Sequence, residues 1–216
     1  MYTAKINRET DWSKIAAFMR EFSFALIVNT DEQGVPHATH IPVSLIEKSP
    51  GNFVLQGHIA KVNPQWQYFE KNDTLIVFSA PHAYVSASWY EKDRIPTWNY
   101  MAVHIHGKTR ILSEDELRKN LEQLVDHYEA ASKCPVHIND IDHKYFENNL
   151  KAVVGFETTV RDINANYKLS NNKNDKDFCS VVDHLKERDH EFDARIAAEM
   201  EVRRPQAGDK KDSGIK

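Results

Sequence analysis

The chain has 216 residues, of which 41% are hydrophobic and 28% are charged, and this composition is typical of a soluble globular protein. Its length allows one domain with a core that needs no disulfide or metal for stability. The 28 lysines and arginines are outnumbered by 32 aspartates and glutamates, so the formal charge of −4 argues against a chain-wide basic surface for nucleic acid.

Three kinds of sequence feature are missing, and their absence argues against further classes of protein. The two cysteines are too few for a disulfide framework and lack CxxC spacing, so we expect reduced thiols in a cytoplasmic protein. No apolar run reaches the roughly 20 residues that span a bilayer, and we expect no membrane association. The seven glycines form neither a GxGxxG fingerprint nor a P-loop, which disfavours a Rossmann domain.

The chain begins with a predicted helix and hairpin. Residues 11–22 place apolar side chains at spacings of three and four after the capping residue Asp11, which predicts a helix. Residues 24–30 form an apolar run that predicts a buried strand. The turn that follows contains Gly34, which can adopt the positive φ angle of a hairpin turn.

The next two segments are also predicted strands. Residues 35–46 alternate between two faces, and residues 53–58 follow after a turn. Because Pro36 and Pro42 cannot donate to a strand ladder, we expect the longer strand to lie at a sheet edge or to be bulged.

The middle of the chain alternates short helical and extended segments. Asn63 precedes a proline, as a helix cap does, and predicts a short helix over residues 64–71. Residues 74–80 form a second buried strand, and residues 100–112 form another that we expect Gly107 to interrupt.

Helices dominate the later part of the chain. Ser113 opens a predicted helix with a capping box, and a loop with a shorter helix is expected over residues 134–151. A long strand over residues 152–163 then precedes helices over residues 175–187 and 190–204.

This order of elements predicts an α+β protein built on an antiparallel barrel, because the strands come early and are not separated by crossover helices. We expect one domain over residues 1–204 and a flexible polar tail over residues 205–216.

One junction has the composition of an anion site. Residues 57–64 leave a strand and enter a helix, whose N-terminus offers amide donors and a favourable dipole. His58, Lys61 and Asn63 add side chains that can hold a phosphate. An ordinary capped helix start is the alternative interpretation.

A long aromatic connection is the second notable segment. Residues 81–99 are too aromatic to be disordered, and long connections within compact domains often carry function. Flat side chains with polar tips suit a planar aromatic ligand or a subunit interface, whereas a lid packed on its own core is the alternative.

Several histidines lie on or near the predicted strands: His37, His40, His58, His82, His104 and His106. Zinc needs three or four ligands that converge, and histidines on a half-buried strand face usually bond to their neighbours. We therefore predict no metal site, and we predict no catalytic residue because no nucleophile motif is present.

Taken together and in order, these segments resemble the PaiB-like family of FMN-binding negative transcriptional regulators. The resemblance extends to about Met200 and is carried mainly by His-Ile-Ala-Lys-Val-Asn-Pro at 58–64, Pro-His-Ala-Tyr-Val-Ser at 81–86, Pro-Thr-Trp-Asn-Tyr at 96–100 and Lys-Leu-Ser at 168–170. Asn171 departs from the family, which has glutamine there.

The resemblance implies a split β-barrel of the FMN-binding kind with peripheral and C-terminal helices. It also implies a homodimer with flavin in the cleft between the subunits, and a role in repressing genes. The same fold occurs in pyridoxamine-phosphate oxidases, flavin reductases and some haem-degrading proteins, so the fold alone does not select an activity.

We predict FMN as the cofactor, because a mononucleotide needs a phosphate cradle, an apolar slot and donors for the ring edge, and not a glycine fingerprint. The predicted contacts are the cradle residues His58, Lys61 and Asn63; the ring residues Thr39, His40, Ile41 and Pro42; the slot residues Trp98 and Asn99; and Lys168 and Ser170.

Two other functions are alternatives to FMN-dependent regulation. One is a flavin-dependent oxidoreductase that takes electrons from a nicotinamide cofactor, and the other is haem binding or breakdown through the histidines. Direct DNA binding is not expected, because Arg195, Arg203 and Arg204 form the only basic stripe and are typical of a solvated helix face.

Overall fold

The computed structural model describes residues 1–92 and 94–204, so the predicted tail over residues 205–216 lies outside the described part. The chain divides into two compact units. The barrel unit consists of Asp11–Phe78 and Val103–Asn164, and the terminal unit consists of Met1–Thr10, Ser79–Ala102 and the chain from Ala165 onward.

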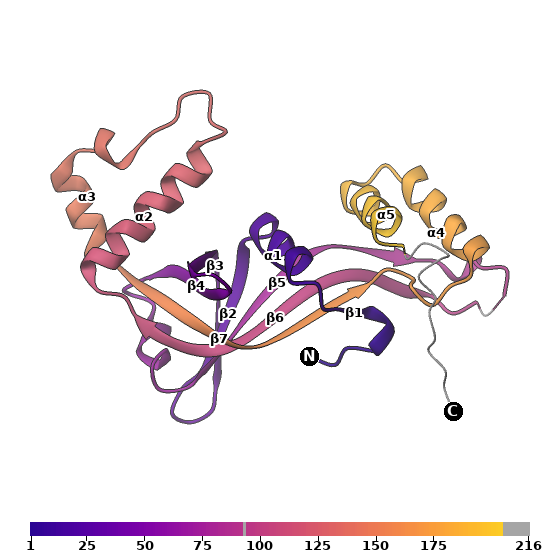
Figure 1. The fold of residues 1–216 in the computed structure, drawn as a ribbon, viewed down its shortest axis with the longest axis horizontal. Coiled ribbons are helices and arrows are strands. Elements are labelled where there is room, and N and C mark those ends of the chain that lie inside the picture. Colours follow the sequence, from indigo (N-terminus) through magenta and orange to yellow (C-terminus); the bar gives the residue numbers. More distant parts are fainter. Residues whose placement is uncertain (93, 205–216) are drawn as a thin grey trace. The chain divides into compact units, whose positions relative to one another are not determined.

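Figure 1 shows the elements in chain order. The strands are β1 (Arg8–Glu9), β2 (Phe24–Thr30), β3 (Pro36–Ser49), β4 (Asn52–Ala60), β5 (Asp73–Val85), β6 (Thr97–Ile111) and β7 (Val153–Lys168). The α-helices are α1 (Trp12–Glu21), α2 (Glu114–Glu129), α3 (His143–Leu150), α4 (Asp175–Glu187) and α5 (Glu191–Arg203). Short 3₁₀ helices are η1 (Lys5–Asn7), η2 (Pro64–Tyr68), η3 (Ala87–Trp89) and η4 (Ile138–Asp140).

Six strands close into an antiparallel barrel. Their order is β7-β4-β3-β2-β5-β6, and a further pairing of β6 with β7 completes the ring. In the terminal unit, β1 adds to β7 through the pairs Arg8–Asn166 and Glu9–Ala165. The predicted α+β fold on an antiparallel barrel is therefore confirmed.

Local signals placed the first elements correctly. The side chain of Asp11 accepts a hydrogen bond from the Ser13 amide at 2.9 Å and caps α1. Gly34 has a φ angle of +82° in the turn between β2 and β3, where a residue with a side chain would be strained.

Of the two alternatives predicted for the strand with Pro36 and Pro42, the edge position was wrong, whereas the irregularity is present: the pairing of β3 with β4 shifts register between Glu47 and Ser49. β3 lies between β2 and β4 in the barrel order, and Pro42 lies where the pairing of β3 changes from β2 to β4. Phe24 of β2 pairs with Pro42, whereas Val43 is the first residue that pairs with β4. The proline therefore occupies a position where the ladder on one side ends, and its missing N–H costs little there.

Three other boundaries differ from the sequence prediction. The helix after Asn63 is only the five-residue 3₁₀ helix η2. The long connection over residues 81–99 is shorter, because β5 continues to Val85 and β6 already begins at Thr97. Gly107 does not interrupt β6: a Cβ there would come within 2.3 Å of the Thr159 carbonyl oxygen, so glycine permits close contact with β7.

The later helices match their predicted positions. Ser113 forms both halves of a capping box with Glu116 at the start of α2. α2 and α3 pack together through a small apolar cluster that includes Leu117 and Leu150. In the terminal unit, α4 and α5 lie side by side (Figure 1) and bury Leu185 and Ile196 completely.

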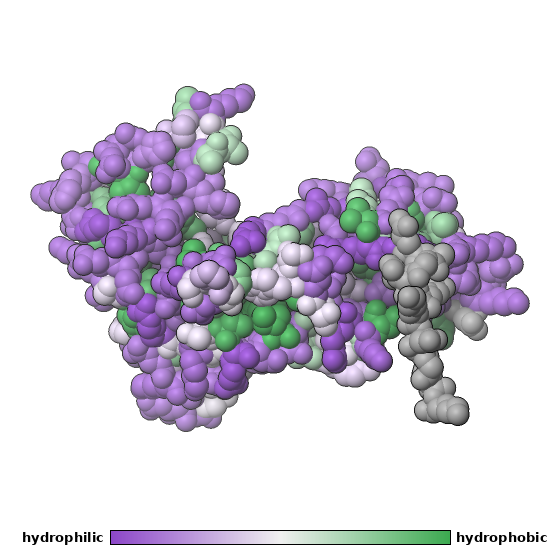
Figure 2. Space-filling view, viewed as in Figure 1, coloured by the Kyte–Doolittle hydropathy of each residue, from purple (hydrophilic) through white to green (hydrophobic). Residues whose placement is uncertain are grey.

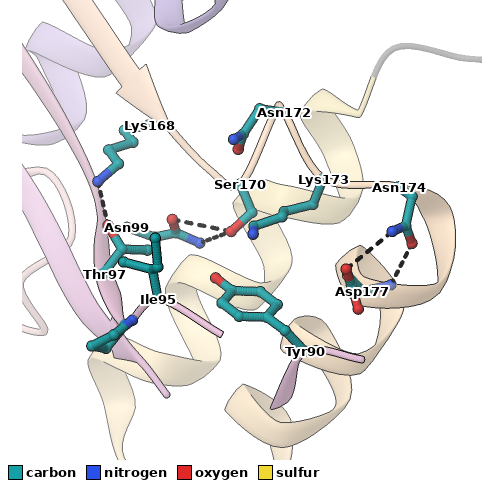
Figure 3. A pocket seen from close by; sticks show the side chains of 11 residues that line it. Tyr90, Ile95, Thr97, Asn99, Lys168, Ser170, Asn172, Lys173, Asn174 and Asp177 are labelled. Carbon is teal, nitrogen blue, oxygen red and sulfur yellow. Dashed lines mark hydrogen bonds between the residues drawn. The ribbon is translucent and has the colours of Figure 1, made fainter. Parts of the chain in front are cut away.

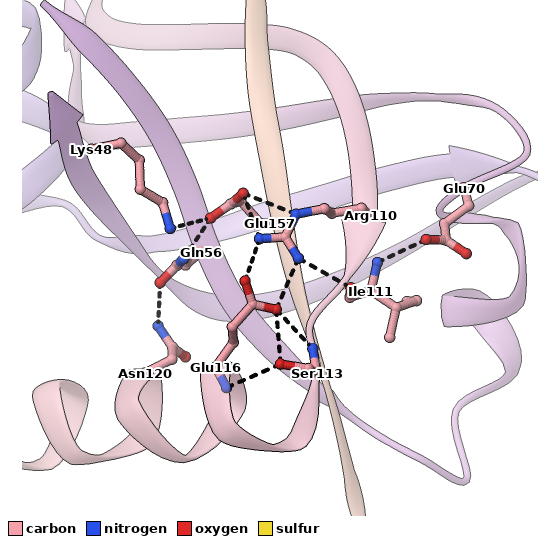
Figure 4. Close-up of polar contacts among 9 residues, drawn as sticks. All are labelled: Lys48, Gln56, Glu70, Arg110, Ile111, Ser113, Glu116, Asn120 and Glu157. Carbon is pink, nitrogen blue, oxygen red and sulfur yellow. Dashed lines mark hydrogen bonds and ion pairs between the residues drawn. The ribbon is translucent and has the colours of Figure 1, made fainter.

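A polar network joins the barrel strands to α2 (Figure 4). Glu157 of β7 is 7% exposed and accepts hydrogen bonds or ion pairs from Lys48, Gln56 and Arg110. Arg110 also forms a two-pronged contact with Glu116 at 2.9 and 2.7 Å. Both oxygens of the buried Glu157 carboxylate have partners, so its charge is not left unpaired. The network also links α2 to β6 and β7, the two strands whose pairing closes the barrel.

The face drawn in Figure 2 is mostly hydrophilic, with hydrophobic side chains gathered in separate patches. Among residues 1–92 and 94–204, no helix is long and apolar enough to cross a membrane.

Candidate functional site

The predicted contact residues fall in both units of the chain. The barrel unit holds Thr39, His40, Ile41, Pro42, His58, Lys61 and Asn63. The terminal unit holds Trp98, Asn99, Lys168 and Ser170.

In the barrel unit, a hydrogen-bonded chain joins β3 to the residues before η2. Asn63 Nδ2 donates to Thr39 Oγ1 at 3.0 Å, and Thr39 Oγ1 donates to Gln65 Oε1 at 2.6 Å. The buried amide of Gln65 in turn donates to the carbonyls of Ile27 and His37 at 3.1 and 3.2 Å. The structure therefore brings Thr39 and Asn63 together, and Gln65 fixes both to the barrel.

Asn63 also caps η2, because its Oδ1 accepts the Gln65 amide at 3.0 Å. This contact occupies one of the amides that the sequence assigned to an anion, and η2 is too short to give a strong helix dipole. The anion-binding capacity of this junction therefore resides in side chains and not in a helix N-terminus.

Lys61 follows β4 directly, and its backbone is held on both sides. Its N–H donates to the Ala152 carbonyl at 2.8 Å, and its carbonyl accepts a hydrogen bond from Trp66 Nε1 at 3.0 Å. The side chain is exposed and makes no ion pair within the described part of the chain. By contrast, Lys48, Lys71 and Lys108 each pair with a carboxylate at 2.5–2.7 Å.

His58 lies on β4, three residues before Lys61. Its Nδ1 is buried and has no hydrogen-bond partner among the described residues. Burial lowers the pKa of the imidazole, so the ring is neutral at pH 7. A neutral, partly buried imidazole with an unpaired nitrogen can accept or donate one hydrogen bond to a ligand.

The remaining barrel residues differ in exposure. His40 is exposed and its ring stacks on Phe24 with centroids 6.0 Å apart, whereas Ile41 is a core residue at 7% exposure. Beside them, Gly57 has no room for a side chain, since a Cβ would come within 3.0 Å of the Pro42 carbonyl oxygen. β3 and β4 therefore approach closely at Pro42.

In the terminal unit, a pocket of about 500 Å³ brings together Asn99, Lys168 and Ser170. We call it the Tyr90 pocket; its other lining residues are Tyr90, Ile95, Pro96, Thr97, Asn172, Lys173, Asn174 and Asp177 (Figure 3). Asn99 Nδ2 donates to Ser170 Oγ at 3.0 Å, although the two residues are 71 positions apart. Lys168 donates to the hydroxyl of Thr97.

Ser170 has a φ angle of +59°, which is unusual for a residue with a side chain. Its hydroxyl is held by the fully buried Asn99 amide. Backbone strain of this kind persists only where surrounding contacts fix it, and it is common at ligand sites.

Trp98 does not line this pocket, because neighbouring residues of a strand face opposite sides. Its ring lies 5.5 Å from His82 and 5.7 Å from Tyr84, beside a second cavity of about 310 Å³. The structure therefore groups Asn99 with Lys168 and Ser170, and groups Trp98 with other aromatic side chains.

The sequence prediction missed Tyr90, Lys173, Asn174 and Asp177 as lining residues. The spacing of Asn174 and Asp177 is a helix-cap signal, and Asp177 N donates to Asn174 Oδ1 at 2.9 Å. Tyr90 lies in the aromatic connection over residues 81–99 that the sequence singled out, but nothing local distinguished it from the other aromatic residues there. Asn171 lies outside the pocket and donates to the carbonyls of Ile6 and Tyr167 at 3.0 and 2.9 Å, a structural role.

The histidines do not form a metal cluster in the described ranges, where no three histidine, cysteine, aspartate or glutamate side chains are placed to hold an ion. Burial lowers the pKa of His104, which favours its neutral form.

Comparison with known sequences gives a family match and a close relative. The family described as "Putative FMN-binding domain" matches residues 1–162. The protein named "Protease synthase and sporulation protein PAI 2" from Bacillus subtilis is 41% identical over 202 residues, with 93% of this chain and 97% of that protein covered.

Two solved structures share the fold at low sequence identity. The FAD and heme binding protein from Mycobacterium smegmatis has a TM-score of 0.60 and 13% identity, with 81% of this chain and 80% of that chain covered. The flavocytochrome Anf3 from Azotobacter vinelandii has a TM-score of 0.57 and 15% identity, with 79% and 74% covered.

Proposed function

The chain belongs to the PaiB-like family of FMN-binding split-barrel proteins, and we propose that it holds the phosphate of FMN at the β4–η2 junction. The observation that carries this proposal is the state of Lys61. Its backbone is fixed by two hydrogen bonds, whereas its ammonium group has no competing carboxylate among the described residues. Phosphate can therefore bind without breaking an existing ion pair.

His58 supports the same assignment. Its ring is neutral and its buried Nδ1 lacks a partner, so the strand that leads to Lys61 carries a polar atom that remains to be satisfied. A ligand that supplies this hydrogen bond would remove the cost of an unpaired buried group. The donor set at this junction therefore fits a phosphorylated ligand.

Thr39 and Asn63 serve as positioning residues in this proposal. Their side chains bond to each other and to Gln65, so they fix the segment that carries Lys61. His40, Ile41 and Pro42 lie on the same strand as Thr39, and we propose that the backbone of this segment faces the flavin ring. Bound FMN itself would supply the electron-transfer chemistry of its ring.

Flavin titration tests the proposed phosphate site. FMN and riboflavin share a ring and differ in the phosphate, so we expect FMN to bind at least about tenfold more tightly, because a charge-assisted hydrogen bond contributes roughly 1.5–3 kcal/mol. Equal affinities for FMN and riboflavin would contradict the phosphate site but would not contradict flavin binding.

We further propose that the protein is a cytoplasmic, flavin-binding regulator of the PaiB-like type that does not bind DNA by itself. The formal charge of −4 gives little counterion release, and both cysteines are free, exposed thiols that suit a reducing compartment. Fluorescence anisotropy with labelled duplex DNA tests this point; tight binding that weakens steeply with salt would contradict it.

We also propose a homodimer through an aromatic patch of the terminal unit, which consists of His82, Tyr84, Trp98 and Phe192. Their ring centroids lie 5.5–5.9 Å apart in neighbouring pairs. Trp98 is 51% exposed and Phe192 is 40% exposed, so the patch leaves large apolar rings in water. Such patches commonly mark interfaces, and a patch that pairs with its own copy gives a two-fold dimer.

A further inference from the structure

We infer that the Tyr90 pocket of the terminal unit binds a second ligand, a small polar metabolite that carries an oxyanion group, and that this ligand is distinct from FMN. The inference does not rest on the phosphate site at Lys61, which lies in the barrel unit. Under this inference, Asn99, Lys168 and Ser170 contact the second ligand and not the flavin.

The first argument is charge. Lys168 and Lys173 both line the pocket, and neither forms an ion pair with a carboxylate in the described part of the chain. Lys173 Nζ instead lies 3.8 Å from the centre of the Tyr90 ring, a cation–π contact that holds the ammonium group at the pocket wall. Two lysines without carboxylate partners favour an anionic ligand.

The acidic residues of this region do not cancel that charge. Asp177 is the one carboxylate among the lining residues, and both its oxygens are occupied: Oδ1 accepts the Glu91 amide at 2.9 Å and Oδ2 accepts Asn174 Nδ2 at 3.0 Å. Nearby Asp175 pairs with Arg204. Two lysines against one carboxylate leave the pocket lining with a net positive charge, and the carboxylate oxygens are held by other donors and not by the lysines.

The second argument is the buried hydroxyl of Tyr90. Tyr90 is 2% exposed, and its Oη interacts with Ser170 but forms no hydrogen bond of normal geometry. Figure 3 shows this hydroxyl directed toward Asn99 and Ser170 inside the pocket. Burial raises the pKa of the phenol, so it remains a proton donor at neutral pH. An oxyanion in the pocket would accept this hydrogen bond.

The third argument concerns size and polarity. Eight of the eleven lining residues are polar or charged, and they include two lysines and several amide and hydroxyl donors. A small polar metabolite needs several convergent donors, whereas a three-ring flavin needs a flat apolar slot. The donor set of the lining therefore fits a compact anion.

Binding of inorganic phosphate and of acetate to the FMN-saturated full-length protein tests the inference, with calorimetry at constant ionic strength as the readout. The first variant is Lys173→Gln, which removes the ammonium charge. The second is Tyr90→Phe, which removes the hydroxyl and keeps the aromatic ring. The matched control is Lys5→Gln, which removes the charge of an exposed lysine outside the pocket. FMN affinity is measured for each variant by flavin fluorescence.

We expect saturable binding of at least one anion, weakened at least about tenfold by Lys173→Gln and about two- to tenfold by Tyr90→Phe. Lys5→Gln should have no effect, and FMN affinity should stay constant throughout. Absence of saturable binding for both anions would overturn the inference, as would equal weakening by Lys5→Gln. Loss of FMN affinity in Lys173→Gln would also overturn it, because the pocket would then hold the flavin. If Lys173→Gln does not fold, Tyr90→Phe alone decides.

Discussion

Arg110 on β6 donates two hydrogen bonds to one carboxylate oxygen of Glu157 on β7, at 3.1 and 2.9 Å. These two strands form the pairing that closes the barrel. The second oxygen of Glu157 is held by Lys48 and Gln56, both at 2.7 Å. A buried carboxylate therefore lies at the β6–β7 pairing that closes the barrel, and side chains make all of its hydrogen bonds.

Replacing Arg110 with methionine should destabilise the protein by roughly 1.5–3 kcal/mol, because the buried Glu157 would lose one of its two cationic partners and keep only Lys48. The matched control is Arg161→Met. Arg161 pairs with Asp73 at 2.9 Å, but both side chains are about half exposed, and removing such a pair should cost less than about 1 kcal/mol. Urea unfolding measures both values; similar losses for the two variants would contradict the importance of the buried network.

The acid dependence of stability should come in part from Glu116. Hydrogen bonds from Arg110 lower the pKa of the Glu116 carboxyl from 4.5 to about 2. The unfolded chain therefore binds more protons between about pH 4.5 and pH 2, and the free energy of unfolding falls as the pH falls through that window.

Glu116→Gln should remove this contribution, so its stability should vary less with pH below about 4.5 than that of the wild type. The effect is modest because the Glu116 side chain is 38% exposed and solvent screens it. Urea midpoints measured across the acidic range would show the difference, and parallel curves for the two proteins would refute the assignment.

Gly107→Ala should destabilise the barrel by at least about 3 kcal/mol, because the added methyl group would clash with backbone that cannot move aside. Its Cβ would lie 2.3 Å from the Thr159 carbonyl oxygen. Gly51→Ala is the control: Gly51 has a φ of +78° but open space around it, so only conformational strain of about 1–2 kcal/mol is expected. Thermal unfolding that ranks Gly51→Ala as the more damaging change would disprove the close approach of β6 and β7.

Much of the fold was predictable because its signals are local. The caps at Asp11 and Ser113 and the turn glycine Gly34 each act over a few residues, and each was placed correctly. The errors arose where tertiary contacts decide. Gly107 was taken as a break because a glycine that admits a neighbouring strand looks the same in sequence as one that interrupts its own strand.

The site was less predictable, because its contacts join distant parts of the chain. The bond between Thr39 and Asn63 spans 24 positions, and the bond between Asn99 and Ser170 spans 71. Residue types suggested each of these side chains as polar ligands, but no local pattern shows which of them meet. Trp98 and Asn99 illustrate the limit, since adjacent residues in a strand belong to different surroundings.

The aromatic patch should hold the homodimer together. Trp98→Ser removes its half-exposed central ring, and we expect the dimer to dissociate at micromolar protein concentration. Tyr145→Ser, which changes a 66% exposed ring of the barrel unit, should leave the dimer intact. Light scattering distinguishes the two states, because the monomer has a mass of 25.0 kDa. A wild-type mass near this value, or a dimer of Trp98→Ser as stable as the wild type, would contradict the proposed interface.

The affinity of Lys61→Ala for FMN and for riboflavin tests the central claim most directly. Lys61 has a fixed backbone and no carboxylate partner among the described residues, so we expect its removal to weaken FMN binding about 10- to 150-fold and to leave riboflavin binding nearly unchanged. Lys144→Ala, which removes an exposed lysine of the same unit, should alter neither affinity. If Lys61→Ala weakens both flavins equally, Lys61 shapes the fold or the ring slot and does not hold the phosphate.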